Sequence, residues 1–218
     1  MWRNVSTKFI EPEEELIRRA RLDPYVNPLI RKVYWDRLRK IFNYLKRRRW
    51  GLILEIGSKH GFLLPSLCQI SDKVIGSDIE ETFRVYRHLT LMKIKNSCPN
   101  LKLMEIDARY LSTYIPENSC DVIIAVSVLE HIREFPLAIS EIEKCLKPSG
   151  IFICSVPTEN KLYKLCRIVL GYSGDYHEGF NFASLRNYLR KKLKEIGSWY
   201  TPFMLPLFFT GIYAKISE

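Results

Sequence analysis

The sequence has few of the features that mark metal-binding, disulfide-stabilised or secreted proteins. Its six cysteines form no Cys-x-x-Cys pair and have no histidine at ligand spacing, so they predict reduced core thiols and no metal site. Its amino-terminal segment has no apolar core of the kind that a secretory signal peptide needs. We therefore expect a cytoplasmic protein.

One long stretch lacks charge. Residues 196–214 contain no acidic or basic side chain, which approaches the length of a membrane-spanning helix. Pro202, Pro206, Gly197 and Gly211 divide the stretch into short pieces. Because proline and glycine disfavour a continuous helix, we predict a hydrophobic terminal hairpin and no transmembrane helix.

Charge is unevenly distributed along the chain, whose 218 residues suffice for one domain with a full core. Residues 1–50 hold 14 Lys and Arg against 6 Asp and Glu, a net charge of +8, whereas residues 51–218 hold 20 against 18, a net charge of +2. We therefore predict a basic helical extension or cap over 1–50. The nearly neutral body over 51–218 is expected to contain an insertion at about 158–182.

Residues 30–49 have the spacing of an amphipathic helix. One helical face is apolar and consists of Ile30, Val33, Tyr34, Leu38, Ile41, Phe42 and Leu45. We expect the helix to lie beside a ligand site, with this apolar face packed on a sheet or on the insertion. Arg37, Lys40 and the cluster 47–49 would then face an anionic small molecule, a nucleic acid or a membrane surface. A capping helix with a solvated basic face explains the same pattern.

The stretch around which the chain is organised follows this helix. An apolar strand over 52–56 has a carboxylate, Glu55, near its end and is followed by a turn between Gly57 and Gly61. Glycine permits positive φ and lets a ligand approach the backbone, so such a turn is a frequent cradle for nucleotide-like ligands. The turn is not G-x-G-x-x-G, which disfavours a nicotinamide dehydrogenase.

Strand-like and helix-like segments alternate after the turn, which predicts an α/β, doubly wound, Rossmann-like sheet that is mostly parallel. The strands expected next are 73–77, 101–106, 120–127 and 151–156, and the helices are 65–70, 80–95, 138–146 and 183–196. Three successive strands end in the carboxylates Glu55, Asp78 and Asp107, at the edge where such sheets bind ligands. Asp78 follows the glycine turn by about twenty residues, where a carboxylate can bind both hydroxyls of a ribose.

Five motifs, in order and at matching spacing, resemble those of the class I S-adenosylmethionine-dependent methyltransferases, in particular the type-11, quinone-biosynthesis-like group. They are Leu54-Glu55-Ile56-Gly57 with Gly61, Gly76-Ser77-Asp78-Ile79, Asp107 to Leu111, Asp121 to Ile132, and Leu146 to Gly150. The resemblance implies a seven-stranded sheet whose last strand is antiparallel. It also implies S-adenosylmethionine as cofactor and S-adenosylhomocysteine as product, without a metal.

The resemblance further implies which residues bind the cofactor. They are Glu55, Gly57, Ser58, Lys59, Gly61, Asp78, Ile79, Asp107, Ala108, Ser127 and Val128. Glu55 and the turn amides would hold the methionine part, Asp78 the ribose and Asp107 the adenine edge. Lys59 departs from the family, which usually has glycine in the middle of the turn. Its side chain either crowds the turn, meets the cofactor carboxylate or points to solvent.

Two histidines are candidates for a general base: His131 after the fourth strand and His177 in the insertion. His131 could equally cap the helix that follows, and many members of this fold need no base. The residues therefore leave the use of a base open.

The acceptor that we expect is a small or lipid-like molecule, and the basic extension favours an anionic one or a peripheral membrane contact. Methylation of RNA is an alternative, favoured less because the sequence shows no RNA-binding module and no aromatic-proline motif after the fourth strand. A third alternative is a non-catalytic scaffold that keeps the fold and binds a partner.

Overall fold

Seven strands form the sheet of the computed structural model, in the order β3-β2-β1-β4-β5-β7-β6. The structure describes residues 8–9, 30–79, 98–170 and 180–216. The pairs β1–β2, β2–β3 and β4–β5 are parallel, whereas the last strand, β7, is antiparallel to both β5 and β6. The predicted α/β class with an antiparallel last strand is confirmed. The chain divides into two compact units, Met1–Glu105 and Ile106–Glu218.

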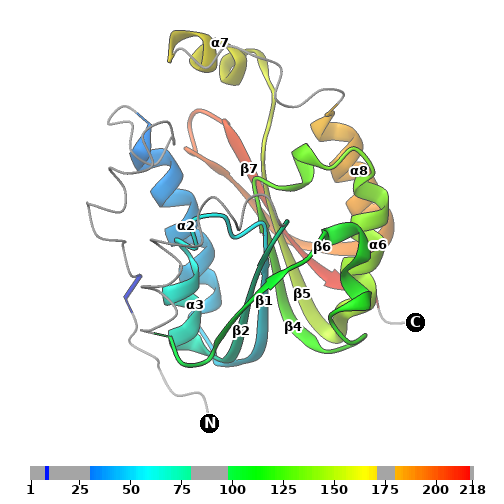
Figure 1. Ribbon diagram of the computed structural model, residues 1–218. Coiled ribbons are helices and arrows are strands. Elements are labelled where there is room, and N and C mark those ends of the chain that lie inside the picture. The colour runs from blue at the N-terminus through cyan, green and yellow to red at the C-terminus, as the bar shows by residue number, and fades with distance from the viewer. Residues whose placement is uncertain (1–7, 10–29, 80–97, 171–179, 217–218) are drawn as a thin grey trace. The chain divides into compact units, whose positions relative to one another are not determined.

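The first unit contains three parallel strands and two described helices. Its elements are α2 (Arg31–Leu45), β1 (Trp50–Ile56), α3 (Leu64–Ile70), β2 (Ser71–Asp78) and β3 (Leu101–Glu105). Residues 53–56 of β1 are all buried, as in parallel strands that are covered on both faces. Figure 1 shows α2 and α3 beside each other, and α3 packs on β1 and β2. Glu55 is therefore the acidic exception within a buried apolar strand.

Helix α2 confirms the predicted amphipathic helix, but it ends at Leu45 and not at Arg49. Its buried apolar side chains are Trp35, Leu38, Ile41, Phe42 and Leu45. Phe9, from the amino-terminal segment, lies against the same face, with ring-centroid distances of 6.3 Å to Trp35 and 5.9 Å to Phe42. The sequence prediction omitted Trp35 from this face.

The described residues of the second unit form four strands, three α-helices and two short 3-10 helices. They are η1 (Ala108–Thr113), β4 (Cys120–Val126), η2 (Leu129–His131), α6 (Phe135–Cys145), β5 (Leu146–Pro157), α7 (Lys161–Val169), α8 (Phe182–Lys192), β6 (Leu193–Thr201) and β7 (Phe208–Lys215). Residues 150–157 of β5 are buried without interruption. Figure 1 shows α6 and α8 on the same side of the strands of this unit, and α7 beyond the end of β5.

One predicted helix ends earlier than the sequence indicates. We expected a helix over 183–196, but α8 ends at Lys192 and β6 begins at Leu193, which pairs with Lys215 of β7. The terminal hairpin of β6 and β7 is confirmed, and no helix in the described ranges is long and apolar enough to cross a bilayer. The helix predicted over 80–95 lies outside the described residues.

Candidate cofactor-binding site

The turn after β1 adopts a conformation that suits glycine. Gly57 and Gly61 have φ angles of 67° and 69°, and Lys59 between them has a φ angle of 42°. The Ser58 N–H donates to the Ser77 carbonyl at 2.9 Å, and the Gly61 N–H donates to the Ser58 carbonyl at 2.6 Å. These bonds close the turn and tie it to the end of β2.

Asp78, at the end of β2, is oriented by two backbone amides. The Lys59 N–H donates to Oδ2 at 2.8 Å, and the Ile79 N–H donates to Oδ1 at 2.9 Å. Because a carboxylate oxygen has two lone pairs, each oxygen can accept a further hydrogen bond. The neighbouring Ile79 side chain is 49% exposed. The end of β2 therefore presents two fixed acceptors beside an apolar side chain.

Glu55 is a buried acid at the end of β1. It is 5% exposed, and its Oε2 has no hydrogen-bond partner among the described residues. Burial, and to a smaller extent the negative charge of Asp78, raises the pKa of Glu55 to about 8. An unpartnered buried carboxyl group costs free energy, so this position favours a cationic donor.

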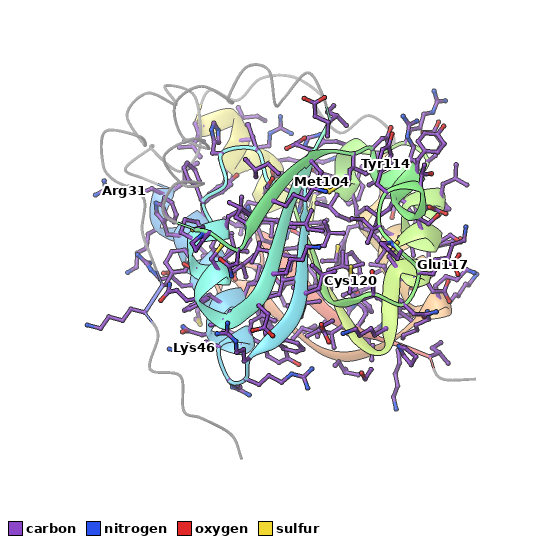
Figure 2. The ribbon with its side chains drawn as sticks, turned by 60° about the horizontal axis from the view of Figure 1, so that its bottom comes forward. Arg31, Lys46, Met104, Tyr114, Glu117 and Cys120 are labelled. Atoms are coloured by element: carbon purple, nitrogen blue, oxygen red, sulfur yellow. The ribbon has the colours of Figure 1, made fainter. Side chains whose placement is uncertain are left out.

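The basic cluster predicted over 47–49 lies away from the glycine turn, and with Lys46 it forms the basic segment 46–49. It connects the end of α2 to the start of β1, where Arg49 Nε lies 2.6 Å from Asp72 Oδ1. Figure 2 labels Arg31 and Lys46, which lie at opposite ends of α2. The seven residues of β1 separate the cluster from the turn by roughly 20 Å. That this cluster faces an anionic partner stays a prediction, but that partner would not lie at the glycine turn.

Arg37 is also misplaced by the sequence prediction. It was assigned to the solvated basic face of α2, but it is only 1% exposed and its guanidinium lies 5.0 Å from the centroid of the Tyr34 ring. Lys40 is exposed, as expected. The helical period alone cannot separate a buried arginine from a solvated one, because both fit a polar position.

Asp107, in the second unit, precedes η1 and is held by Arg109. The Arg109 guanidinium donates to both carboxylate oxygens, with Nη2 2.6 Å from Oδ2, and the Arg109 backbone N–H donates to Oδ1 at 2.9 Å. The hydrogen bonds from the Arg109 side chain are the main reason that the pKa of Asp107 is lowered. Ala108 is buried at the start of η1. The carboxylate is ionised and oriented, and its contact with adenine stays a prediction.

Ser127 and Val128 follow β4 in a strained turn. Ser127 has a φ angle of 55°, and its N–H donates to the Ser155 carbonyl at 2.8 Å. The short helix η2 then ends at His131, which is exposed and whose N–H donates to the Val128 carbonyl at 2.9 Å. The next helix, α6, has Glu134 at its N-cap, so the alternative that His131 caps this helix is wrong. His177, the other candidate base, lies outside the described residues.

Comparisons with known proteins point to one family. Residues 54–154 match a family model described as a methyltransferase domain. A probable S-adenosylmethionine-dependent methyltransferase from Mycolicibacterium smegmatis is 26% identical over 126 residues, which are 57% of this chain and 46% of the relative. Arginine-hydroxylase NDUFAF5, mitochondrial, from Rattus norvegicus is 27% identical over 119 residues, which are 54% of this chain and 32% of the relative. The matches thus span less than half the length of either relative.

Solved structures of methyltransferases have the same fold as this chain. Magnesium protoporphyrin IX methyltransferase (ChlM) from Synechocystis PCC 6803, with bound SAH, has a TM-score of 0.70 at 18% identity, covering 93% of this chain and 94% of its own. A SAM dependent methyltransferase from Aquifex aeolicus has a TM-score of 0.67 at 15% identity, covering 94% of this chain and 100% of its own. Residues 54–154 thus match the methyltransferase-domain family, and the fold over more than nine tenths of the chain is that of S-adenosylmethionine-dependent methyltransferases.

The methyltransferase-domain match begins one residue before Glu55 and includes both Asp78 and Ser127. It therefore contains the turn and the strand ends described above. Among the described residues, no group of three or more His, Cys, Asp or Glu side chains is placed to hold a metal ion.

His60 is a residue of this methyltransferase domain that the sequence prediction missed. It lies inside the glycine turn, is 6% exposed and stacks on Phe62, with 5.1 Å between ring centroids and 19° between planes. Phe62 in turn lies 5.3 Å from the ring of Trp35 in α2. The position of His60 between the two turn glycines could have drawn attention to it in the sequence. That its ring is buried against Phe62 is visible only in the fold.

Lys59→Gly is expected to stabilise the ligand-free protein by about 1 kcal/mol, because a residue with a Cβ is strained at positive φ. The Lys59 side chain is exposed, and its backbone N–H, which glycine retains, holds Asp78. Affinity for S-adenosylhomocysteine should therefore hold, whereas loss of an ion pair to the cofactor carboxylate would lower it roughly tenfold. Urea unfolding and calorimetry test the two statements. The control is Lys73→Gly in β2, where glycine should destabilise by about 0.5–1 kcal/mol.

Proposed function

We propose that this protein transfers a methyl group from S-adenosylmethionine to a small or lipid-like acceptor. The observation that carries the proposal is the buried Glu55 carboxyl group, whose Oε2 has no partner, together with the oriented carboxylate of Asp78. A primary ammonium fits the first group and a pair of ribose hydroxyls fits the second. S-adenosylmethionine carries both.

Other residues of the site would complete the binding of the cofactor. The backbone between Gly57 and Gly61, with Ser58 and Lys59, would lie along the methionine carboxylate. The exposed side chain of Ile79 offers an apolar surface to adenine. The roles proposed for Asp107 and Ala108 at the adenine edge, and for Ser127 and Val128 near the methyl group, rest on the resemblance of their motifs to those of the methyltransferases.

The proposed reaction needs alignment more than side-chain chemistry. The bound cofactor supplies a methyl group on a cationic sulfur. A lone pair of the acceptor bonds to the methyl carbon while the carbon–sulfur electrons pass to sulfur, which leaves neutral S-adenosylhomocysteine. Holding the two reactants in line supplies much of the rate. An acceptor that must lose a proton also needs a base, for which His131 is our candidate.

Two observations bear on the alternatives. The rat relative is named a hydroxylase, so the test must detect methyl transfer itself. RNA methylation was favoured by the basic helix, but the cluster 46–49 lies at the amino end of β1. We therefore retain the small or lipid-like acceptor as the proposal.

A binding screen followed by a transfer assay tests the proposal. S-adenosylmethionine and S-adenosylhomocysteine should raise the melting temperature, and NAD should not. The protein is then incubated with trideuteromethyl-labelled S-adenosylmethionine and, separately, a lipid extract, a polar metabolite extract and total RNA. We expect a trideuteromethylated product in the lipid or polar extract. Binding without any labelled product would favour the scaffold, and label in RNA alone would contradict the proposed acceptor.

A further inference from the structure

The large apolar side chains with the highest exposure in the described residues all belong to the second unit. Phe203 and Met204, in the loop between β6 and β7, are 83% and 84% exposed, and Ile168 and Val169 of α7 are 72% and 75% exposed. Leu165 and Leu205 are half exposed beside them in the sequence. We call these six residues the apolar tip. Side chains as exposed as these project from the surface, and large exposed apolar groups mark interaction sites.

The two parts of the apolar tip are held at the same end of the unit. Asn160, at the start of α7, donates from Nδ2 to the Pro206 carbonyl at 2.8 Å, and Thr158 Oγ1 donates to the same carbonyl at 2.7 Å. Tyr163 of α7 packs edge-on against Phe208 at the start of β7, with 5.7 Å between centroids. Helix α7 and the hairpin loop therefore form one connected surface.

The exposed apolar face of α7 points away from its own unit. Tyr163 is the buried residue of α7 and marks the inner side of the helix. Residues two, five and six positions later lie about 200°, 140° and 240° around the helix from it, at 100° per residue. Leu165, Ile168 and Val169 are thus on the side of the helix opposite Tyr163. An amphipathic helix that binds an apolar surface has its apolar side chains arranged in this way.

Among the described residues, the charged side chains in α7 and just before it are mainly positive. Lys161 and Lys164 of α7 are exposed and Arg167 is half-buried, while Glu159 precedes the helix. A short amphipathic helix with lysines beside exposed aliphatic and aromatic side chains is typical of proteins that bind the surface of anionic bilayers. An anionic surface also complements this charge, which a second copy of the same basic surface would not.

We propose that the apolar tip inserts into the interface of an anionic lipid membrane. The further step, that a lipid-like acceptor reaches the site through this surface, rests on the proposed function. Within the second unit, α7 begins four residues after the end of β5, and β5 is joined to the end of β4 by the bond from the Ser127 N–H to the Ser155 carbonyl. The tip therefore lies at the strand ends where Ser127 is expected to face the methyl group. An acceptor held in the bilayer would enter the site from this side.

Vesicle flotation tests the surface without any cofactor. The full chain should bind vesicles of phosphatidylcholine with phosphatidylglycerol and bind pure phosphatidylcholine much more weakly. Phe203→Ser with Met204→Ser, and separately Ile168→Ser with Val169→Ser, should each weaken binding about tenfold or more, since each removes two inserted apolar side chains. Lys161→Ser with Lys164→Ser should reduce the preference for phosphatidylglycerol and its sensitivity to salt.

Matched control variants test whether vesicle binding depends on the apolar tip itself or on exposed apolar and basic side chains in general. Tyr114→Ser with Leu137→Ser changes two apolar side chains that are 53% and 55% exposed elsewhere in the unit, and should leave binding unchanged. Arg47→Ser with Arg49→Ser removes two charges from the other basic cluster and should also have little effect. Equal losses in these controls, full binding by the tip variants, or no binding by the wild type would each overturn the proposal.

Two further readouts distinguish the remaining outcomes. If the wild type is a dimer that the tip variants convert to monomers, and it does not bind vesicles, the surface joins two copies and the membrane proposal is wrong. Calorimetry with S-adenosylhomocysteine should give the same affinity for every variant in this set. Vesicle binding without cofactor binding would refute the proposed function and leave the membrane surface standing.

Discussion

Replacing Asp78 with alanine is expected to weaken the binding of S-adenosylhomocysteine by about 30- to 150-fold. The variant loses two hydrogen bonds from ribose hydroxyls to a charged acceptor, an estimated 2–3 kcal/mol. It also loses the groups that accept from the Lys59 and Ile79 amides, so the turn is held less firmly. Isothermal titration calorimetry measures the effect.

Asp72→Ala is the matched control. Asp72 is a carboxylate in the same strand, but it lies at the amino end of β2 and pairs with Arg49 on the surface. Its removal should leave cofactor affinity unchanged. A loss smaller than about threefold in the Asp78 variant, or an equal loss in both, would remove Asp78 from the site.

Glu55→Gln is expected to abolish a proton release that accompanies cofactor binding. With a pKa of about 8, Glu55 is mostly protonated at pH 7 in the free protein. A bound ammonium favours the carboxylate, so binding should release close to one proton, about 0.9 at pH 7 by linkage. The measured binding heat of the wild type should therefore depend on the ionisation enthalpy of the buffer. Affinity should fall at least about tenfold in the variant, which cannot form the ion pair.

The buffers for this experiment are phosphate and Tris, which differ in ionisation enthalpy. The wild type should give different heats in the two buffers, and Glu55→Gln should give the same heat in both. Asp72→Ala again serves as the control and should behave like the wild type. A wild type whose binding heat is independent of the buffer would show that no buried acid ionises on binding.

The same substitution should change the pH dependence of stability without ligand. The pKa of Glu55 is about 8 in the fold against an ordinary value of 4.5. Between these values the folded state binds more protons than the unfolded state, so the contribution of Glu55 to stability falls as pH rises through this window. Glutamine does not ionise. Glu55→Gln should therefore melt at a higher temperature than the wild type at pH 8, and the difference should shrink towards pH 4.5.

The strands and the glycine turn were predictable because their causes are local. Residues 53–56 and 122–125 are buried parallel strands, and they read as continuous apolar runs apart from Glu55. Gly57 and Gly61 adopt the positive φ angles that favour glycine. Because the carboxyl ends of parallel strands lie at the same edge of a sheet, carboxylates at these ends are expected to lie near one another.

The structural features that could not be predicted from the sequence depend on contacts with residues that are distant in the chain. Residues 193–196 have no helix breaker before Gly197, and only pairing with β7 makes them a strand. Arg37 fits the polar side of a helical pattern, yet the fold buries it beside Tyr34. The raised pKa of Glu55 likewise requires its burial in the folded chain, together with the charge of Asp78. The sequence placed Glu55 in a predicted apolar strand, but its raised pKa and unpartnered oxygen emerged only from the structure.

A crystal structure of the protein with S-adenosylhomocysteine tests the central claim most directly, since it locates each part of the ligand against Glu55 and Asp78. The account predicts the amino nitrogen within hydrogen-bond distance of Glu55 Oε2 and the two ribose hydroxyls on the carboxylate of Asp78, with both side chains near their present positions. Ligand density elsewhere, or density at the glycine turn with Glu55 still unpartnered, would contradict it.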